Sequence, residues 1–181
     1  MSRRLRHCVA CGARLRRLRV DGHLRRRCPR CGWVFYDNPV PAVVALIERR
    51  GMVLLARRAA APHRGTWDLP GGFMEAGETP LRALARELRE ELGVRVRGRP
   101  RLAGFFADTY GPGGFPVLGI VYRVAIQGRP RAADDVGEVH WIARARLPLR
   151  GIRFPGLRAA LRVLVPPRRA GAARRRGARR A

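Results

Sequence analysis

The stretch GFMEAGETPLRALARELREELGV, residues 72–94, decides the fold that we predict for this chain. It contains five of the thirteen acidic residues of a chain that carries 39 arginines and no lysine. Thr79 and Pro80 are typical of a helix N-cap and first turn, and Gly93 is typical of a helix end. We therefore expect a helix over 80–92.

The expected helix has an apolar stripe and an acidic flank. Residues at helical spacing form the stripe: Leu81, Leu84, Ala85, Leu88 and Leu92. Glu87, Glu90 and Glu91 share the flank, where like charges three or four residues apart repel one another. A hard divalent cation such as Mg²⁺, which takes oxygen ligands, would offset that repulsion. The alternative is a solvated acidic face.

The whole stretch resembles the Nudix box, the signature of hydrolases that cleave nucleoside diphosphates linked to another group. That signature is Gly-x5-Glu-x7-Arg-Glu-U-x-Glu-Glu-x-Gly-U, where U is apolar. The chain matches it at every fixed position: Gly72, Glu78, Arg86, Glu87, Leu88, Glu90, Glu91, Gly93 and Val94. The preceding GTWDLPGG, residues 65–72, resembles the segment that commonly leads into the box.

The resemblance implies an α/β fold, the Nudix α/β/α sandwich, and hydrolysis of a phosphorus anhydride by attack of water. It implies that Mg²⁺ or Mn²⁺ is held by the box carboxylates and the Gly72 carbonyl, with these ligands: Gly72, Glu87, Glu90 and Glu91. Arg86 would be structural, paired with Glu78.

A carboxylate outside the box often supplies the general base in this family. The acidic turn that precedes the predicted strand ending at Trp141 offers Asp134, Asp135 and Glu138, and we include Glu138 with the three box glutamates as catalytic candidates. A box glutamate or a merely solvated acidic turn is the alternative.

Substrate choice in the family often depends on loops after the box. The segment YGPGGFP, residues 110–116, is our candidate, and we predict substrate contacts from Tyr110, Phe115 and Arg57. NADH-cleaving relatives that carry a zinc ribbon show Ser-Gln-Pro-Trp-Pro-Phe-Pro-x-Ser after the box, and residues 94–115 contain nothing like it. ADP-ribose or a nucleotide sugar is therefore favoured as substrate. RNA 5′ ends or dinucleoside polyphosphates are one alternative, and a nucleotide-sensing, nucleic-acid-binding regulator is another.

Two CxxC pairs, separated by sixteen residues, precede this domain. Four thiolates with that spacing can close a tetrahedral zinc site, and the segment resembles a zinc ribbon. The four predicted Zn²⁺ ligands are Cys8, Cys11, Cys28 and Cys31. Redox or disulfide pairs are the alternative. We expect a structural role for this ribbon, with dimerisation or nucleic-acid contact left open, including base stacking by Trp33 or Tyr36.

The composition gives a formal charge of +26, which would suggest a nucleic-acid binder. Arginine is spread along the whole chain, so we favour a compositional bias over dedicated nucleic-acid binding. The N-terminus lacks the apolar core of a signal peptide, and no apolar run approaches a membrane span. We therefore expect a cytoplasmic protein that takes a nucleotide-type substrate and has no membrane partner; a homodimer is left open.

The predicted organisation is a zinc ribbon over 1–37, a Nudix domain over 38–165 and a disordered basic tail over 166–181. Apolar runs predict a hairpin of strands over 42–48 and 52–56. Further strands are expected after the box, at 94–96, 101–110 and 116–126. A final amphipathic helix is expected near the end, at 154–164.

Overall fold

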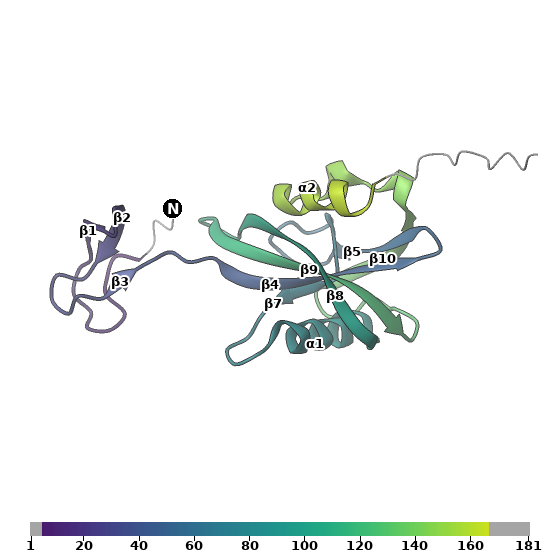
Figure 1. Ribbon diagram of the computed structural model, residues 1–181, viewed down its shortest axis with the longest axis horizontal. Coiled ribbons are helices and arrows are strands. Elements are labelled where there is room, and N and C mark those ends of the chain that lie inside the picture. Colours follow the sequence, from purple (N-terminus) through teal and green to yellow (C-terminus); the bar gives the residue numbers. More distant parts are fainter. Residues whose placement is uncertain (1–4, 167–181) are drawn as a thin grey trace, which may run out of the picture.

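The computed structural model describes residues 5–166, so the predicted tail lies, except for its first residue, outside the described residues. Figure 1 shows a small sheet at the N-terminal end and a larger sheet flanked by two helices. The small sheet is antiparallel, with strand order β1-β2-β3. Its strands are β1 (Arg16–Val20), β2 (His23–Arg27) and β3 (Val34–Phe35).

The larger sheet is mixed and has the order β10-β5-β4-β9-β8. At its centre β4 and β9 run parallel, with Val40 opposite Val117, whereas the other pairs are antiparallel. Two short strands join it: β6 (Trp67–Asp68) pairs with β5, and β7 (Gly71–Phe73) pairs with β4. The five main strands are β4 (Val40–Arg49), β5 (Met52–Arg58), β8 (Arg95–Tyr110), β9 (Phe115–Gln127) and β10 (Val136–Ala143).

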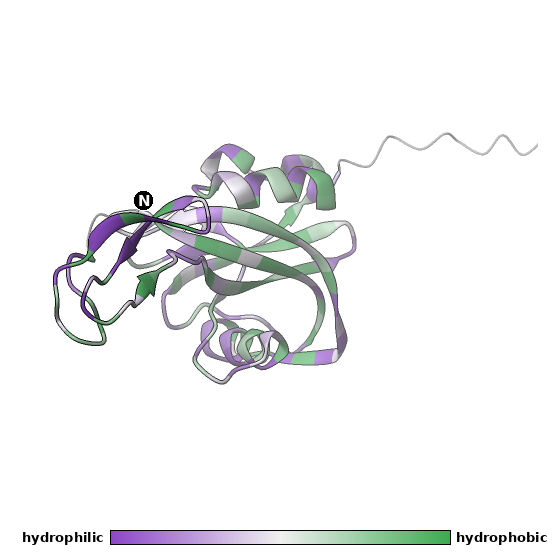
Figure 2. Ribbon diagram, turned by 60° about the vertical axis from the view of Figure 1, so that its left-hand side comes forward, coloured by the Kyte–Doolittle hydropathy of each residue, from purple (hydrophilic) through white to green (hydrophobic). Residues whose placement is uncertain are grey.

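The two helices, α1 (Pro80–Leu92) and α2 (Pro155–Leu164), cover opposite faces of this sheet (Figure 1). Successive strand side chains point to opposite faces, and β4 supplies both. Val44 and Leu46 join a buried cluster with α2, whereas Val43, Ala45 and Ile47 join a second cluster with α1. In Figure 2 the strands of the large sheet are mostly green, and the central strands β4 and β5 have runs of buried residues that face both sides, as expected of strands covered on both faces. The layers form the predicted α/β sandwich.

The bounds predicted for α1 are confirmed. The Thr79 side chain accepts a hydrogen bond from the Arg82 N–H, and Gly93 ends the helix in the left-handed conformation at φ 64°. The predicted apolar stripe is partly wrong: Ala83 is fully buried, whereas Leu81 is 40% exposed and Ala85 is exposed. The helix is rotated so that Glu91 is also buried, which brings a carboxylate toward the sheet.

The region after the box differs from the prediction in two places. Residues 94–96 and 101–110 were expected as separate strands but belong to the single strand β8, whose register to β9 shifts between Arg97 and Arg101 and between Leu102 and Gly104. The expected loop over 110–116 is a tight turn joining β8 to β9.

Two 3-10 turns, Arg144–Arg146 and Leu149–Gly151, lead into α2. Neither helix within residues 5–166 is long and apolar enough to cross a membrane.

Candidate active site

Arg86 on α1 organises the box side chains. Its Nε and Nη2 donate to the two carboxylate oxygens of Glu78 at 2.8 and 3.0 Å, and its Nη2 also donates to the Phe73 carbonyl at 3.0 Å. Its Nη1 donates to Glu87 at 2.8 Å and to Glu90 at 3.1 Å. The Arg86 hydrogen bonds lower the pKa of Glu78 to about 2. One guanidinium therefore ties the loop before the helix to the acidic flank of the helix.

Among the residues that the structure describes, Glu91 is the one charged residue that is buried, with 5% of its surface exposed. Its Oε2 accepts a hydrogen bond from the Gly71 N–H at 2.8 Å. Burial is the main reason that the pKa of Glu91 rises to about 9; the Gly71 N–H opposes this shift, and the negative charges of Asp135, Glu87 and Asp68 add to it. The groups around Glu91 therefore do not supply enough positive charge to stabilise its ionised form.

Gly72 lies directly against Glu87. A Cβ atom at position 72 would stand 2.6 Å from the Glu87 Oε1, a distance that forces the carboxylate to move. Burial raises the pKa of Glu87 as well. Glu90 is more exposed and pairs with Arg86 and, at 3.6 Å, with Arg89.

A cavity of about 350 Å³ opens beside these groups. Gly72, Arg86, Glu87 and Glu91 line it, and Glu90 does not. Its polar wall continues with Arg58, Asp68, Asp134 and Asp135, and its apolar wall includes Phe73, Phe106, Tyr110, Phe154 and Leu157. The cavity therefore joins a charged half to an aromatic half.

Several predicted site residues lie elsewhere. Glu138 and Arg57 are outside the cavity lining and face each other across β10 and β5, with their charged atoms 3.6 Å apart. Glu138 also lies 3.0 Å from His140, which lowers the pKa of this carboxyl. Phe115 does not line the cavity, but its ring packs 5.6 Å from that of Tyr110.

Arg58 connects four segments around the cavity. Its Nη2 donates to the Tyr110 hydroxyl at 3.0 Å and its Nε to the Pro62 carbonyl at 3.1 Å. Its guanidinium lies 3.6 Å from the Asp68 carboxylate and 3.5 Å from that of Asp135. Burial raises the pKa of Asp68 to about 7, although the Arg58 charge opposes that shift.

Two carboxylates in the cavity wall, Asp68 and Asp108, were not singled out from the sequence. Asp68 occupies a position that the GTWDLPGG pattern leaves unspecified, so only its folded surroundings reveal it. Asp108 on β8 accepts hydrogen bonds from the N–H groups of Gly156 and Leu157 at 2.8 and 3.1 Å. It thereby caps the N-terminus of α2 from a distant strand.

The donor chemistry of the charged half suits a hard divalent cation. Glu87 and Glu91 offer oxygen ligands whose ionised forms are disfavoured by burial, and a dication would reverse that effect. Glu87 and Glu90 are instead paired with Arg86 in this structure. Metal binding would therefore require small movements of these side chains.

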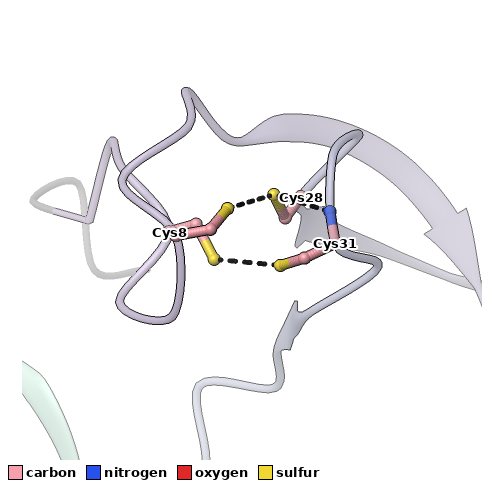
Figure 3. A group of neighbouring side chains, drawn as sticks. Cys8, Cys28 and Cys31 are labelled. Carbon is pink, nitrogen blue, oxygen red and sulfur yellow. Dashed lines mark hydrogen bonds between the residues drawn. The ribbon is translucent and has the colours of Figure 1, made fainter.

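The four cysteines form a second centre, in which cysteines from two separate loops face one another (Figure 3). Within residues 5–166, these four cysteines form the one cluster of at least three candidate metal ligands whose ligand atoms all lie within 4.8 Å of one another. The Cys8–Cys31 and Cys11–Cys28 sulfurs lie 3.5 Å apart, too far for disulfide bonds. The Cys31 N–H lowers the pKa of the Cys28 thiol to about 6, whereas the pKa of the Cys31 thiol, although the Trp33 N–H lowers it, is raised to about 12 by contacts with Cys8, Cys11 and Cys28. The cluster is compatible with zinc.

Comparison with known families agrees with the fold and the box. The profile described as NUDIX domain matches residues 38–162, about 69% of the chain. The chain belongs to the Nudix hydrolase family. Homologues of this family are named pyrophosphatases, and the family generally uses Mg²⁺ or Mn²⁺.

Individual Nudix relatives differ in their named substrates. The chain is 35% identical over 114 residues to an ADP-ribose pyrophosphatase of Methanocaldococcus jannaschii, covering 62% of this chain and 67% of the relative. It is 38% identical over 96 residues to the NAD-capped RNA hydrolase NudC of Pseudomonas aeruginosa, covering 52% of this chain and only 33% of the relative. The chain therefore spans about a third of that second protein.

A solved Nudix structure matches more of the chain. The NUDIX hydrolase from Nitrosomonas europaea is 31% identical, with a TM-score of 0.68, and the match covers 87% of this chain and 88% of that one. A match confined to residues 38–181 could cover at most about 80% of this chain. Because the match covers 87%, it includes some of the residues before 38.

Proposed function

We propose that this chain is a Mg²⁺- or Mn²⁺-dependent Nudix pyrophosphohydrolase that cleaves the diphosphate linkage of a nucleoside diphosphate derivative such as ADP-ribose or a nucleotide sugar. The observation that carries the proposal is the cavity in which the partly buried Glu87 and the buried Glu91 meet an aromatic wall. Such a cavity combines a place for charged phosphates and their cation with a place for a flat base or sugar.

In this proposal Glu87, Glu90, Glu91 and the Gly72 carbonyl hold the divalent cation. When bound, the cation offsets the negative charge of the phosphates and lowers the pKa of the attacking water. Arg86 keeps Glu87 and Glu90 oriented through its hydrogen bonds. Gly72 leaves the space that the Glu87 carboxylate occupies.

Asp135 replaces Glu138 as our candidate for the general base outside the box. It lines the cavity and is close enough to raise the pKa of both Glu87 and Glu91, whereas Glu138 faces Arg57 outside the lining. A base must lie within hydrogen-bond reach of the water that it deprotonates. The geometry of the described residues therefore favours Asp135, with a box glutamate as the alternative.

Arg58 and Tyr110 are the proposed substrate contacts. The Arg58 guanidinium, in the charged half, suits a phosphate oxygen, and the Tyr110 ring borders the aromatic half. ADP-ribose is favoured because the M. jannaschii relative carries that name and because the NADH motif is absent from residues 94–115. Activity on capped RNA 5′ ends is the second candidate, favoured by the similarity to NudC.

Residues 1–37 are proposed as a separate zinc ribbon with Zn²⁺ held by the four cysteines, followed by a Nudix domain over 38–165. The cysteine geometry and the reach of the N. europaea match support this division. A module of this size gains most of its folding free energy from its metal.

The test is turnover of ADP-ribose, a nucleotide sugar, NADH and NAD-capped RNA with Mg²⁺ or Mn²⁺, with products identified by mass. We expect Glu91→Gln to lower kcat/KM for the best substrate at least about 100-fold, more than the loss typical of a group that only orients a ligand. Glu138→Gln, which alters a glutamate outside the cavity, is the matched control and should retain near-normal activity. Equal activity of the Glu91→Gln variant, or no turnover of any compound, would contradict the proposal.

A further inference from the structure

The β1–β2 hairpin is far richer in arginine than the rest of the chain. Six of its ten strand residues are arginine, namely Arg16, Arg17, Arg19, Arg25, Arg26 and Arg27, whereas 39 of all 181 residues are basic. The longest strand, β8, has four arginines among sixteen residues. The general bias of the chain therefore does not account for this hairpin.

The register of the hairpin places like charges directly opposite each other. Arg16 pairs with Arg27, and Arg17 pairs with Arg26. Directly opposed side chains lie on the same face of a sheet, and like charges there destabilise the pairing. A polyanion bound beside Arg17 and Arg26 would relieve the repulsion within that pair.

A groove at this hairpin combines basic and aromatic side chains. It is lined by Arg17, His23, Leu24, Arg25, Arg26, Phe35, Tyr36 and Asp37. Tyr36 is 48% exposed, and the Arg25 guanidinium lies 4.6 Å from the centre of its ring. The Arg25 Nη1 donates to the Tyr36 carbonyl oxygen at 3.4 Å, which helps to hold the guanidinium beside this ring. The groove therefore combines basic side chains with a half-exposed aromatic ring.

We propose that this groove binds single-stranded nucleic acid. Arginines contact the phosphates, and Tyr36 stacks on a base. A basic groove with an aromatic platform is the arrangement that holds single strands without reading their sequence. A duplex keeps its base faces stacked internally, so it could use only the phosphate contacts.

This groove is separate from the catalytic cavity. The two share no lining residue. The inference therefore goes beyond the proposed hydrolase activity, and a test of binding does not depend on turnover.

The experiment measures binding of zinc-loaded full-length protein to a 12-nucleotide uridine RNA by fluorescence anisotropy over a range of salt concentrations. The RNA carries a 5′ hydroxyl and a 3′ fluorophore, so it has no diphosphate for the hydrolase to cleave. The test variant is Arg17→Gln/Arg25→Gln. The matched control is Arg95→Gln/Arg99→Gln, which removes two exposed arginines from β8.

We expect the test variant to bind at least tenfold more weakly and its salt slope to fall by about 1.4, since each phosphate contact on a single strand contributes about 0.7. The control should stay within twofold of the unaltered protein. Equal loss in both variants would show a response to net charge alone, and no loss in either would place binding elsewhere. Either result, or no binding by the unaltered protein, overturns the proposal.

Tyr36→Ala gives a second measurement that removes no charge. We expect roughly tenfold weaker binding of the single strand with an unchanged salt slope, as for the loss of one stacked base. The same variant should bind a duplex of equal length as the unaltered protein does. An unchanged affinity for the single strand would overturn the stacking contact. Zinc content is measured for every variant, and Tyr36→Ala decides the test if the arginine variant loses zinc.

Discussion

The cysteine module and the Nudix domain are stabilised in different ways. In residues 5–37 the buried residues are Cys8 and Cys28, and the apolar side chains Val9, Leu18 and Leu24 are exposed. The Nudix domain buries two apolar clusters, one on each face of its sheet. In the module, candidate metal ligands occupy the place that apolar side chains take in the domain.

This difference separates two sources of folding free energy. Burial of apolar surface stabilises a domain of more than one hundred residues, but a module of some thirty residues cannot bury enough of it. Metal coordination can supply the missing free energy. Each of the following changes should therefore affect one region and leave the other nearly unaltered.

The largest expected effect is that of Cys28→Ser, which removes one of the four sulfurs. We expect the module to lose zinc and unfold, because Cys8 is the other buried residue within residues 5–37. Metal content and the amide NMR spectrum measure this loss, and the melting transition of the Nudix domain should persist. His7→Ser, at an exposed position beside the cysteines, is the control. A module that stays folded without zinc would contradict the claim that metal coordination supplies its folding free energy.

A smaller effect is expected from truncating one leucine in each region. Leu88 on α1 is fully buried against the sheet, so Leu88→Ala should lower the free energy of unfolding of the Nudix domain by about 3 kcal/mol. Leu24 is 55% exposed in β2, so Leu24→Ala should change stability by less than about 0.5 kcal/mol. Urea unfolding followed by circular dichroism measures the first, and zinc affinity measures the second. Similar losses from both substitutions would mean that the module has an apolar core after all.

The smallest expected effect concerns pH. Burial raises the pKa of Asp68 from 3.8 to about 7 in the folded domain. The folded state therefore holds this proton more tightly than the unfolded state, and the resulting stability is complete below pH 3.8 and is lost as pH rises through 7. Without divalent metal, Asp68 should lower the melting temperature of the Nudix domain by a few degrees between pH 5 and pH 8, in addition to the decrease caused by Glu91, whose pKa burial also raises.

The control for this pH dependence is Asp68→Asn, which has no proton to lose. Differential scanning calorimetry of both proteins, from pH 5 to pH 8, measures the difference in slope. A decrease of the same size in Asp68→Asn would assign the pH dependence to other groups.

Features set by local sequence were predictable. The bounds of α1 follow from Thr79, Pro80 and Gly93, each of which acts on its own neighbours. Which face of α1 is buried depends instead on where the sheet lies, so Leu81 was expected inside and Ala83 was overlooked. The pattern of leucines shows that a helix has an inner face but does not fix its rotation.

The membership of the cavity depends on strand register, which the sequence does not reveal. Arg57 and Arg58 are neighbours on β5, yet only Arg58 lines the cavity, because successive side chains on a strand point to opposite faces. On β10 the register shifts between Val136 and Glu138, and Glu138 lies opposite Arg57. Asp135, just before this strand, reaches the cavity instead.

The parallel pairing of β4 with β9 has a consequence for how this chain is made. Val40 lies opposite Val117, so the central strand must wait for a partner that leaves the ribosome some 77 residues later. Until then β4, with six consecutive residues that end up buried, lacks its main neighbour. Non-local pairing of this kind folds slowly and leaves apolar segments exposed to aggregation. We therefore expect the nascent chain to be most prone to aggregation in the interval between the synthesis of β4 and that of β9.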